Sequence, residues 1–209
     1  MLATKAIPRG TRILTETPLF KLNLTRGETK IAAALKTLSA KDIERFLRLA
    51  NCRPEIPLLS AIFETNALPC GLNGGGNIAT SAGLFIAASR FNSSCRPNVN
   101  NTWNEATQTI RIHALRDITE GEELCLCYTS MMGTKAERQE CTQRKFAFTC
   151  TCTACQLTGM DASISDARRK EIAEFQENTW TPATSPQEWV SKVSCSNSFK
   201  KLILTCPVG

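Results

Sequence analysis

The 209-residue sequence has little of several features that mark other classes of protein. It contains no apolar run close to the roughly 20 residues that a membrane-spanning helix needs. Its opening segment, MLATKAIPRG, reaches Pro8 and Gly10 without the apolar stretch of a secretory leader. We therefore expect an intracellular protein, in the nucleus or the cytoplasm, that has no membrane partner.

The excess of one sign of charge is also small. The chain has 25 basic and 19 acidic residues, which gives a net charge of +6. The one tight basic cluster, residues 168–170, is followed at once by Glu171 and Glu174, as on a solvated helix face. We expect no direct binding of nucleic acid, and the mildly basic surface has no special attraction for a basic peptide tail.

Histidine is nearly absent, because His113 is the single one in the chain and falls in a predicted strand. This disfavours a catalytic triad of the Ser–His–Asp or Cys–His kind. The glycine-rich segment GLNGGG, residues 71–76, lacks the Lys-Ser/Thr ending of a phosphate-binding loop. A nucleotide-hydrolysing site is therefore disfavoured as well.

Cysteine, by contrast, is abundant, with eleven residues. The number is odd and no leader directs the chain to an oxidising compartment, so metal binding and burial are favoured over disulfides. Cys150, Cys152 and Cys155 form a C-x-C-x2-C run that supplies three of the four ligands of a structural zinc site. Three unligated thiols in a loop are the less favoured alternative. Spacing leaves the fourth ligand open among several candidates: Cys95, Cys125, Cys127 and Cys141.

The periodicity of apolar residues predicts a mostly β protein with a helical insertion. Short strands are expected at 12–14, 84–88, 99–103, 109–114 and 123–128. Helices are expected as a pair within 28–50, with Ser39 as N-cap of the second, and at 58–66, 134–146 and 163–178. Ser163 or Ser165 is the expected N-cap of the last helix. From periodicity alone, Tyr128 fits a core aromatic, and Phe146 and Phe148 fit one apolar face of a strand.

Four segments together resemble a known family. They are ATKAIPRGTRILTETPLF, RFNSSCRPN, IHALRDITEGEELCLCY and FAFTCTCTAC, in this order. They are similar to SET-domain lysine methyltransferases, above all to the SET-and-MYND-related branch and fungal SET-domain proteins. No zinc-binding MYND insertion is visible, and the resemblance covers about residues 2–156.

The resemblance implies a SET-domain β-fold of small twisted sheets with a pseudoknot, in which one C-terminal segment threads under a loop. The SET domain would span residues 1–130, with the helical insertion at about 28–66. A post-SET helix and a small zinc-binding cysteine module would follow at 131–156. Residues 157–209 would form a helical or irregular C-terminal tail.

The activity that the resemblance implies is transfer of a methyl group from S-adenosylmethionine to a lysine amine of a histone or non-histone protein. The chain would act as a monomer. Tyr128 would lie at the point of methyl transfer, and Cys95 would complete a structural Zn²⁺ site with the three clustered cysteines. Asn92 would bind the amino-acid end of the cofactor with help from Ser89 and Asn66. The adenine would contact the remaining three residues: Ser93, Phe146 and Phe148.

The sequence departs from the family pattern in two places. The family's Gly-x-Gly turn, expected just before the ATKAIPRG-like segment, is not in the sequence given. Ser93 stands where the family carries histidine in its Asn-His-Ser-Cys motif. These departures favour an alternative, in which the chain is a catalytically weak or inactive SET-like module, stabilised by zinc, that binds other proteins.

Overall fold

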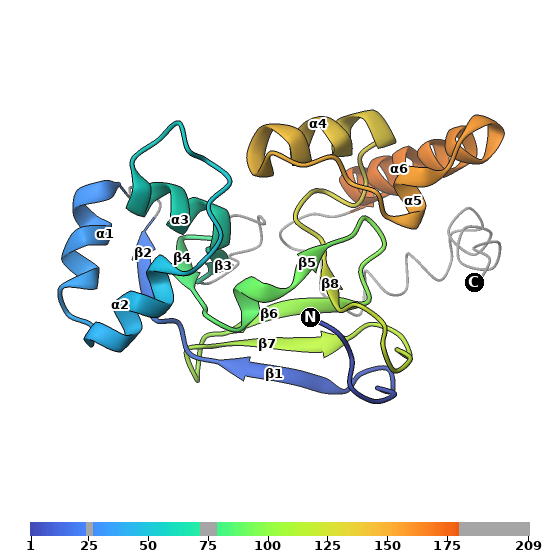
Figure 1. The fold of residues 1–209 in the computed structure, drawn as a ribbon. Helices are drawn as coiled ribbons and strands as arrows, with labels where there is room; N and C mark the ends of the chain where they lie inside the picture. Colours follow the sequence, from blue (N-terminus) through green and yellow to red (C-terminus); the bar gives the residue numbers. More distant parts are fainter. Residues whose placement is uncertain (24–26, 72–78, 180–209) are drawn as a thin grey trace.

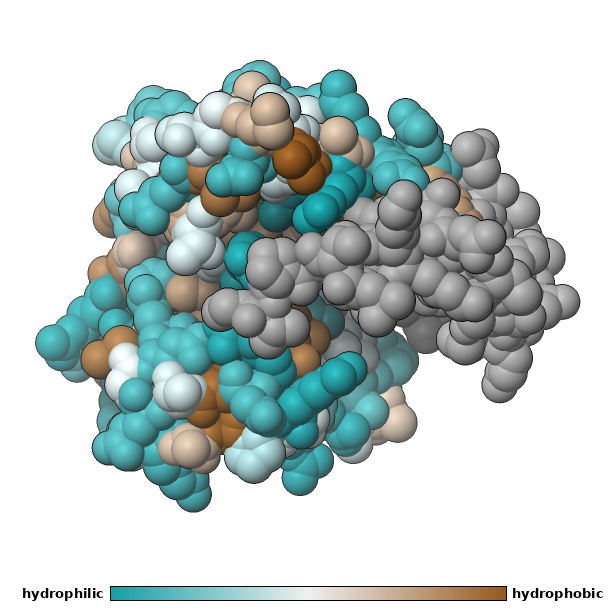
Figure 2. Space-filling view, turned by 90° about the vertical axis from the view of Figure 1, so that its right-hand side faces the viewer, coloured by the Kyte–Doolittle hydropathy of each residue, from teal (hydrophilic) through white to brown (hydrophobic). Residues whose placement is uncertain are grey.

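The computed structural model describes residues 1–23, 27–71 and 79–179 (Figure 1). The predicted tail after Thr179 and residues 72–76 of the predicted loop lie outside the described residues. In the described part, no helix is both long and apolar enough to cross a membrane. Figure 2 shows a face on which hydrophilic side chains predominate and hydrophobic ones are scattered.

Three antiparallel strands make the first sheet, in the order β1-β7-β6. They are β1 (Arg12–Glu16), β7 (Thr109–Ala114) and β6 (Val99–Asn104). The central strand lies where a strand was predicted, and it alternates, because Ile110, Ile112 and Ala114 are buried while Arg111 and His113 are only partly buried. The buried side chains join Phe85 and other apolar residues in one core cluster.

The second sheet carries the predicted helical insertion. Its strands, in the order β2-β4-β3, are β2 (Phe20–Asn23), β4 (Ser81–Leu84) and β3 (Leu68–Cys70). The three helices are α1 (Glu28–Leu35), α2 (Ala40–Leu47) and α3 (Leu58–Asn66), close to their predicted bounds. The Ser39 hydroxyl accepts a hydrogen bond from Asp42 N, which confirms the predicted cap. A second core cluster, which includes Phe46 and Phe63, lies between these helices and the sheet.

A short parallel pair brings together segments that are distant in the sequence. β5 (Asn92–Ser93) pairs with β8 (Cys125–Leu126), and Ser94 N donates to Leu126 O at 2.8 Å. Leu2 forms an antiparallel bridge to Glu123 on the other side. The RFNSSCRPN segment and the segment before Tyr128 therefore lie side by side (Figure 1).

The C-terminal helices lie together on one side of the sheets (Figure 1). They are α4 (Lys135–Phe146), α5 (Thr153–Gln156) and α6 (Gly159–Thr179). Thr134 and Glu137 form a reciprocal capping box at the start of α4. The helix ends at Phe146, and the left-handed φ of 54° at the C-cap Ala147 turns the chain toward the cysteine run.

Three of the predicted bounds were wrong. The strand expected at 84–88 lies at 81–84, because the Glu16 carboxylate accepts hydrogen bonds from the backbone N–H groups of Ala87 and Ala88 and holds the 3₁₀ turn η1 (Ala88–Arg90) there. The strand expected at 123–128 pairs only at 125–126. The last helix begins at Gly159, so Ser163 is not its cap but donates back to the Gly159 carbonyl within the helix.

Candidate functional site

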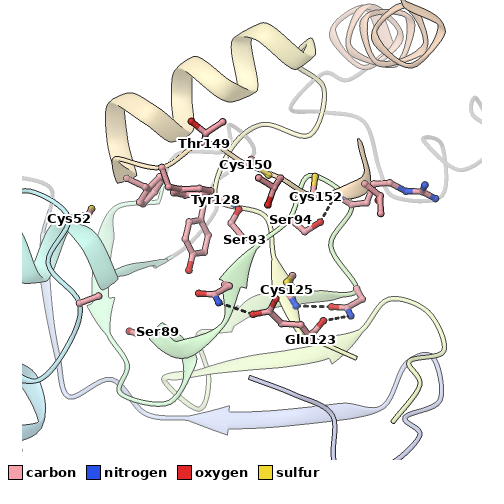
Figure 3. Close-up of a pocket in the computed structure, with 18 of the residues that line it drawn as sticks. Cys52, Ser89, Ser93, Ser94, Glu123, Cys125, Tyr128, Thr149, Cys150 and Cys152 are labelled. Atoms are coloured by element: carbon pink, nitrogen blue, oxygen red, sulfur yellow. Dashed lines mark hydrogen bonds between the residues drawn. The ribbon is translucent and has the colours of Figure 1, made fainter. Parts of the chain in front are cut away.

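A cavity of about 650 Å³ opens between the sheets and the C-terminal helices (Figure 3). Four parts of the chain line it: the loop after α2 with the end of α3, the segment 89–98, the segment 116–128 and the segment 146–153. The seven residues predicted to bind the cofactor or to lie at the reaction centre all line this cavity: Asn66, Ser89, Asn92, Ser93, Tyr128, Phe146 and Phe148. A volume of this size suits a cofactor or a drug-sized ligand.

Asn92 and Ser93 occupy the middle of the cavity through the β5–β8 pairing. Asn92 is exposed, and its Nδ2 donates to Glu123 Oε1 at 2.8 Å. The Ser93 hydroxyl accepts a hydrogen bond from Tyr128 N at 3.1 Å. In Figure 3, Ser93 lies close to Tyr128, between Thr149 on the side of α4 and Glu123 on the side of the sheets. The serine that replaces the family's histidine thus helps to fix the backbone of Tyr128.

Tyr128 is partly buried, and its hydroxyl is already hydrogen-bonded. The hydroxyl donates to Phe91 O at 2.5 Å, and the ring centroid lies 4.9 Å from that of Phe146. Burial, helped by the neighbouring Cys125, raises the pKa of Tyr128 to about 12. The hydroxyl is therefore neutral at physiological pH, and it acts as a hydrogen-bonding group and not as a base.

The two phenylalanines do not share the face of one strand. Phe146 is the last residue of α4, and Phe148 follows the left-handed turn at Ala147. Phe146 packs on Tyr128, whereas Phe148 packs on the cysteine cluster. Both line the cavity, where each offers an aromatic surface to a flat ring.

Asn66, at the end of α3, and Ser89, in η1, also line the cavity. Their side chains hydrogen-bond neighbouring segments of the chain. Asn66 is 7% exposed, and its Nδ2 donates to the carbonyls of Ala50 and Ile62, both at 2.7 Å. The Ser89 hydroxyl donates to Asn66 O at 3.0 Å. The Asn66 amide therefore ties the end of α3 to the loop after α2. The Ser89 hydroxyl ties η1 to Asn66 O or to Phe85 O, and the side-chain oxygen atoms of both residues are left to accept hydrogen bonds from a ligand.

Two adjacent glutamates, Glu122 and Glu123, also belong to the site. Glu123 lines the cavity beside Asn92, and Glu122 accepts hydrogen bonds from Asn98 and Arg116. The hydrogen bond and charge of Arg116 lower the pKa of Glu122 to about 2. Asn98 also accepts from Cys125 N, so these groups fix the segment that leads to Tyr128. Adjacent acidic residues near a glycine gave no sequence signal for this arrangement.

Four cysteines converge beside the cavity. The Sγ atoms of Cys95, Cys150, Cys152 and Cys155 all lie within 4.8 Å of one another, with Cys95 at 3.9 Å from Cys150 and 3.6 Å from Cys155. A tetrahedron with zinc–sulfur bonds of about 2.3 Å has sulfur–sulfur edges of about 3.8 Å. The four sulfurs therefore fit a structural zinc ion, and the geometry selects Cys95 from the candidates that spacing left open.

The other candidates for the fourth ligand lie elsewhere. Cys125 lines the cavity, Cys127 donates to Thr129 O at 3.1 Å, and Cys141 is on α4. Within the cluster, a hydrogen bond with Cys152 raises the pKa of Cys95, and the same hydrogen bond lowers the pKa of Cys152 to about 3. One thiolate is thus already favoured at this centre, which is the form that binds metal.

The fold is β-rich, with small antiparallel sheets and a parallel β5–β8 pair. It has a cavity that is large enough for a cofactor, with a four-cysteine centre beside it. The family model "SET domain" matches residues 1–129, and the chain belongs to this family. This confirms the resemblance and, at the level of small sheets with helices, the predicted fold.

The chain is also similar to curated proteins. It is 37% identical over 179 residues to the histone-lysine N-methyltransferase set5 of Schizosaccharomyces pombe, which covers 84% of this chain and 53% of that protein. It is 35% identical over 96 residues to the human histone-lysine N-methyltransferase SMYD3, 46% of this chain and 22% of that protein. The Arabidopsis thaliana histone-lysine N-methyltransferase ATXR4 is 37% identical over 84 residues, 40% of this chain and 25% of that protein. The chain thus spans about half of the yeast relative and less of the other two.

Proposed function

We propose that this chain is an S-adenosylmethionine-dependent protein-lysine N-methyltransferase. Membership of the SET family and the names of the relatives support this activity. The observation that carries the proposal is the single cavity that gathers Asn92, Tyr128, Phe146 and Phe148 from segments far apart in the sequence. If these four residues only stabilised the fold, they would not all need to face one cavity.

S-adenosylmethionine, when bound, supplies the activated methyl group. The exposed Asn92 amide and the Glu123 carboxylate suit the charged amino-acid end of the cofactor, which has both a carboxylate and an amine. Phe146 and Phe148 suit the adenine, and the oxygen atoms of Ser89 and Asn66 can accept further hydrogen bonds. The Ser93 backbone, next to Tyr128, completes this wall.

Tyr128 orients the lysine amine in this proposal and does not remove its proton. The hydroxyl is held by Phe91 O, and its high pKa keeps it neutral. Together with main-chain carbonyls, it can line the path of a neutral amine and direct the lone pair of the nitrogen. The substrate is a histone or non-histone protein that carries an accessible lysine. The enzyme acts on it as a monomer in the nucleus or the cytoplasm.

We further propose that Cys95, Cys150, Cys152 and Cys155 hold a structural Zn²⁺. The ion would tie residues 131–156, as a post-SET module, to the RFNSSCRPN segment of the SET domain at 1–130. Cys150 and Cys152 also line the cavity, so the metal would fix one of its walls. The threading of the C-terminal segment that makes the family's pseudoknot is part of this proposal, as is the separate tail at 157–209.

A methyl-transfer assay with labelled cofactor tests the activity. We expect the wild-type chain to label core histones or a mixture of lysine-rich proteins. Tyr128→Phe should lower the rate about 100-fold, the scale of a misplaced reacting group, while cofactor affinity stays within about threefold. Thr107→Ala, in the turn between β6 and β7, is the matched control that should keep full rate. No transfer by the wild type, despite tight binding of the cofactor, would favour the alternative of an inactive interaction module.

A further inference from the structure

Arg138 is a buried cation beside the cysteine cluster. It lies on α4, is 1% exposed, and is among the largest fully buried side chains in the described residues. Its Nη1 donates to Gly133 O and its Nη2 lies 3.9 Å from Cys155 Sγ. Its Nε has no hydrogen-bond partner in the described part of the chain. A charge in such a place is costly unless an opposite charge lies nearby.

The nearest carboxylate in the described residues is a weak partner. Asp166 Oδ1 lies 3.8 Å from Arg138 Nη1, and its side chain is 28% exposed. The same oxygen accepts a hydrogen bond from Lys135 N at 2.8 Å. This long and partly solvated ion pair does not balance a guanidinium that is almost fully buried.

The cluster itself supplies the missing charge if it holds zinc. Four thiolates and one Zn²⁺ carry a net charge of −2, close to the guanidinium. Arg169 approaches from α6, where its Nη2 donates to Cys95 O at 3.3 Å. Two guanidinium groups from two helices thus lie near a centre of two negative charges, and neutral cysteines would leave the buried Arg138 with only its weak ion pair to Asp166.

We propose that Arg138 is a positioning residue of the cysteine centre, which offsets the negative charge of the metal-bound thiolates and orients Cys155. The inference rests on the zinc site of the proposed function, though not on catalysis. Arginine suits this place because its planar guanidinium stays charged at any physiological pH and reaches Gly133 O and Cys155 at once. A hydrogen bond to a metal-bound thiolate is the kind of outer contact that tunes the affinity of a metal site.

Competition for zinc between the full chain and a fluorescent chelator, at fixed pH, tests the proposal. The variants are Arg138→Gln, which removes the charge, and Arg138→Lys, which keeps it. The control is Arg144→Gln, the same change at an exposed position of the same helix. We expect one zinc per wild-type chain and about 10–100-fold weaker binding in Arg138→Gln. Arg138→Lys should recover most of the affinity, and Arg144→Gln should bind like the wild type.

Equal losses in Arg138→Gln and Arg138→Lys would show that the charge of Arg138 does not set the zinc affinity, and would overturn the proposal. Zinc affinity of Arg138→Gln equal to that of the wild type would overturn it as well. If Arg138→Gln fails to fold, the rate of zinc release from Arg138→Lys and wild type, prepared with saturating zinc, decides: a release more than about tenfold faster in the lysine variant contradicts the charge role. A wild type without zinc would overturn both this inference and the zinc site, whereas loss of methyl transfer with zinc intact would count only against the proposed activity.

Discussion

The two walls of the cavity are built by different means. The wall formed by the sheets is supported by two apolar clusters. They have eleven and eight buried residues and are rich in Ile, Leu and Phe. The wall that follows α4 rests on a cluster of four buried residues, of which three are cysteines. Burial of apolar side chains suffices to order the first wall, whereas the second has too little apolar surface and depends on what its sulfurs bind. Changes in the two walls should therefore separate cleanly.

Loss of the proposed zinc ion should have the largest effect, and only on the second wall. Binding of structural zinc by a cysteine site is worth about 10–16 kcal/mol, which is comparable to the whole stability of a typical domain. Cys95→Ser should lower the zinc content and, in hydrogen exchange, expose the amides of 148–156 while those of β6 and β7 stay protected. Cys70→Ser, a change of another buried cysteine outside the cluster, is the control. Equal loss of protection in both walls would break the comparison.

A deletion in the apolar core should do the reverse. Phe85 is fully buried in the first cluster and makes an edge contact with Trp103. Phe85→Ala should lower the free energy of unfolding by about 3–5 kcal/mol in a urea titration, with zinc content unchanged at low urea. Leu47→Ala, at a position that is 47% exposed, should cost less than about 1 kcal/mol. Loss of zinc in folded Phe85→Ala would mean that the walls are not independent.

Tyr128 lies where the two walls meet. The ionisation of its hydroxyl should change the stability of the folded chain with pH, by less than the changes above. Because it is the single tyrosine, its ionisation can be followed by absorbance at 295 nm. We expect an apparent pKa of about 12 in the folded chain and about 10 in urea. Since the folded state holds this proton more tightly, its contribution to stability is complete below about pH 10 and is lost as the pH rises toward 12. A folded-state value of 10 would contradict the burial of the hydroxyl, and Tyr128→Phe should show no such transition.

Sequence reasoning predicted the elements whose signals are local. The alternation in β7, the N-cap at Ser39 and the capping-box helix at 135–146 follow from neighbouring residues. The pairing of β2 with β4 joins residues some sixty positions apart, and β2 alternates over only four residues, too few to predict a strand. For the same reason, the hydrogen bonds that the Glu16 carboxylate accepts at the start of η1 could not be predicted.

The site followed a similar division. The spacing of three of the cysteines predicted a metal site, but Cys95 could be placed with them only by the family resemblance and then by the convergence of the four sulfurs. Glu123 and Arg138 gave no signal, because an acidic turn residue and an arginine in a polar helix both fit a solvated surface. Long-range packing, which decides whether such a side chain is buried, cannot be inferred from its neighbours in the sequence.

Calorimetric titration of the full chain with S-adenosylmethionine tests the central claim, that this cavity binds the cofactor through Asn92. We expect saturable binding, weakened about 10–100-fold by Asn92→Ala, since a hydrogen bond to a charged group contributes about 1.5–3 kcal/mol. Asn100→Ala, on an exposed position of β6, should bind like the wild type. Absence of binding heat for the wild type at millimolar cofactor would contradict the account, as would equal affinity in Asn92→Ala.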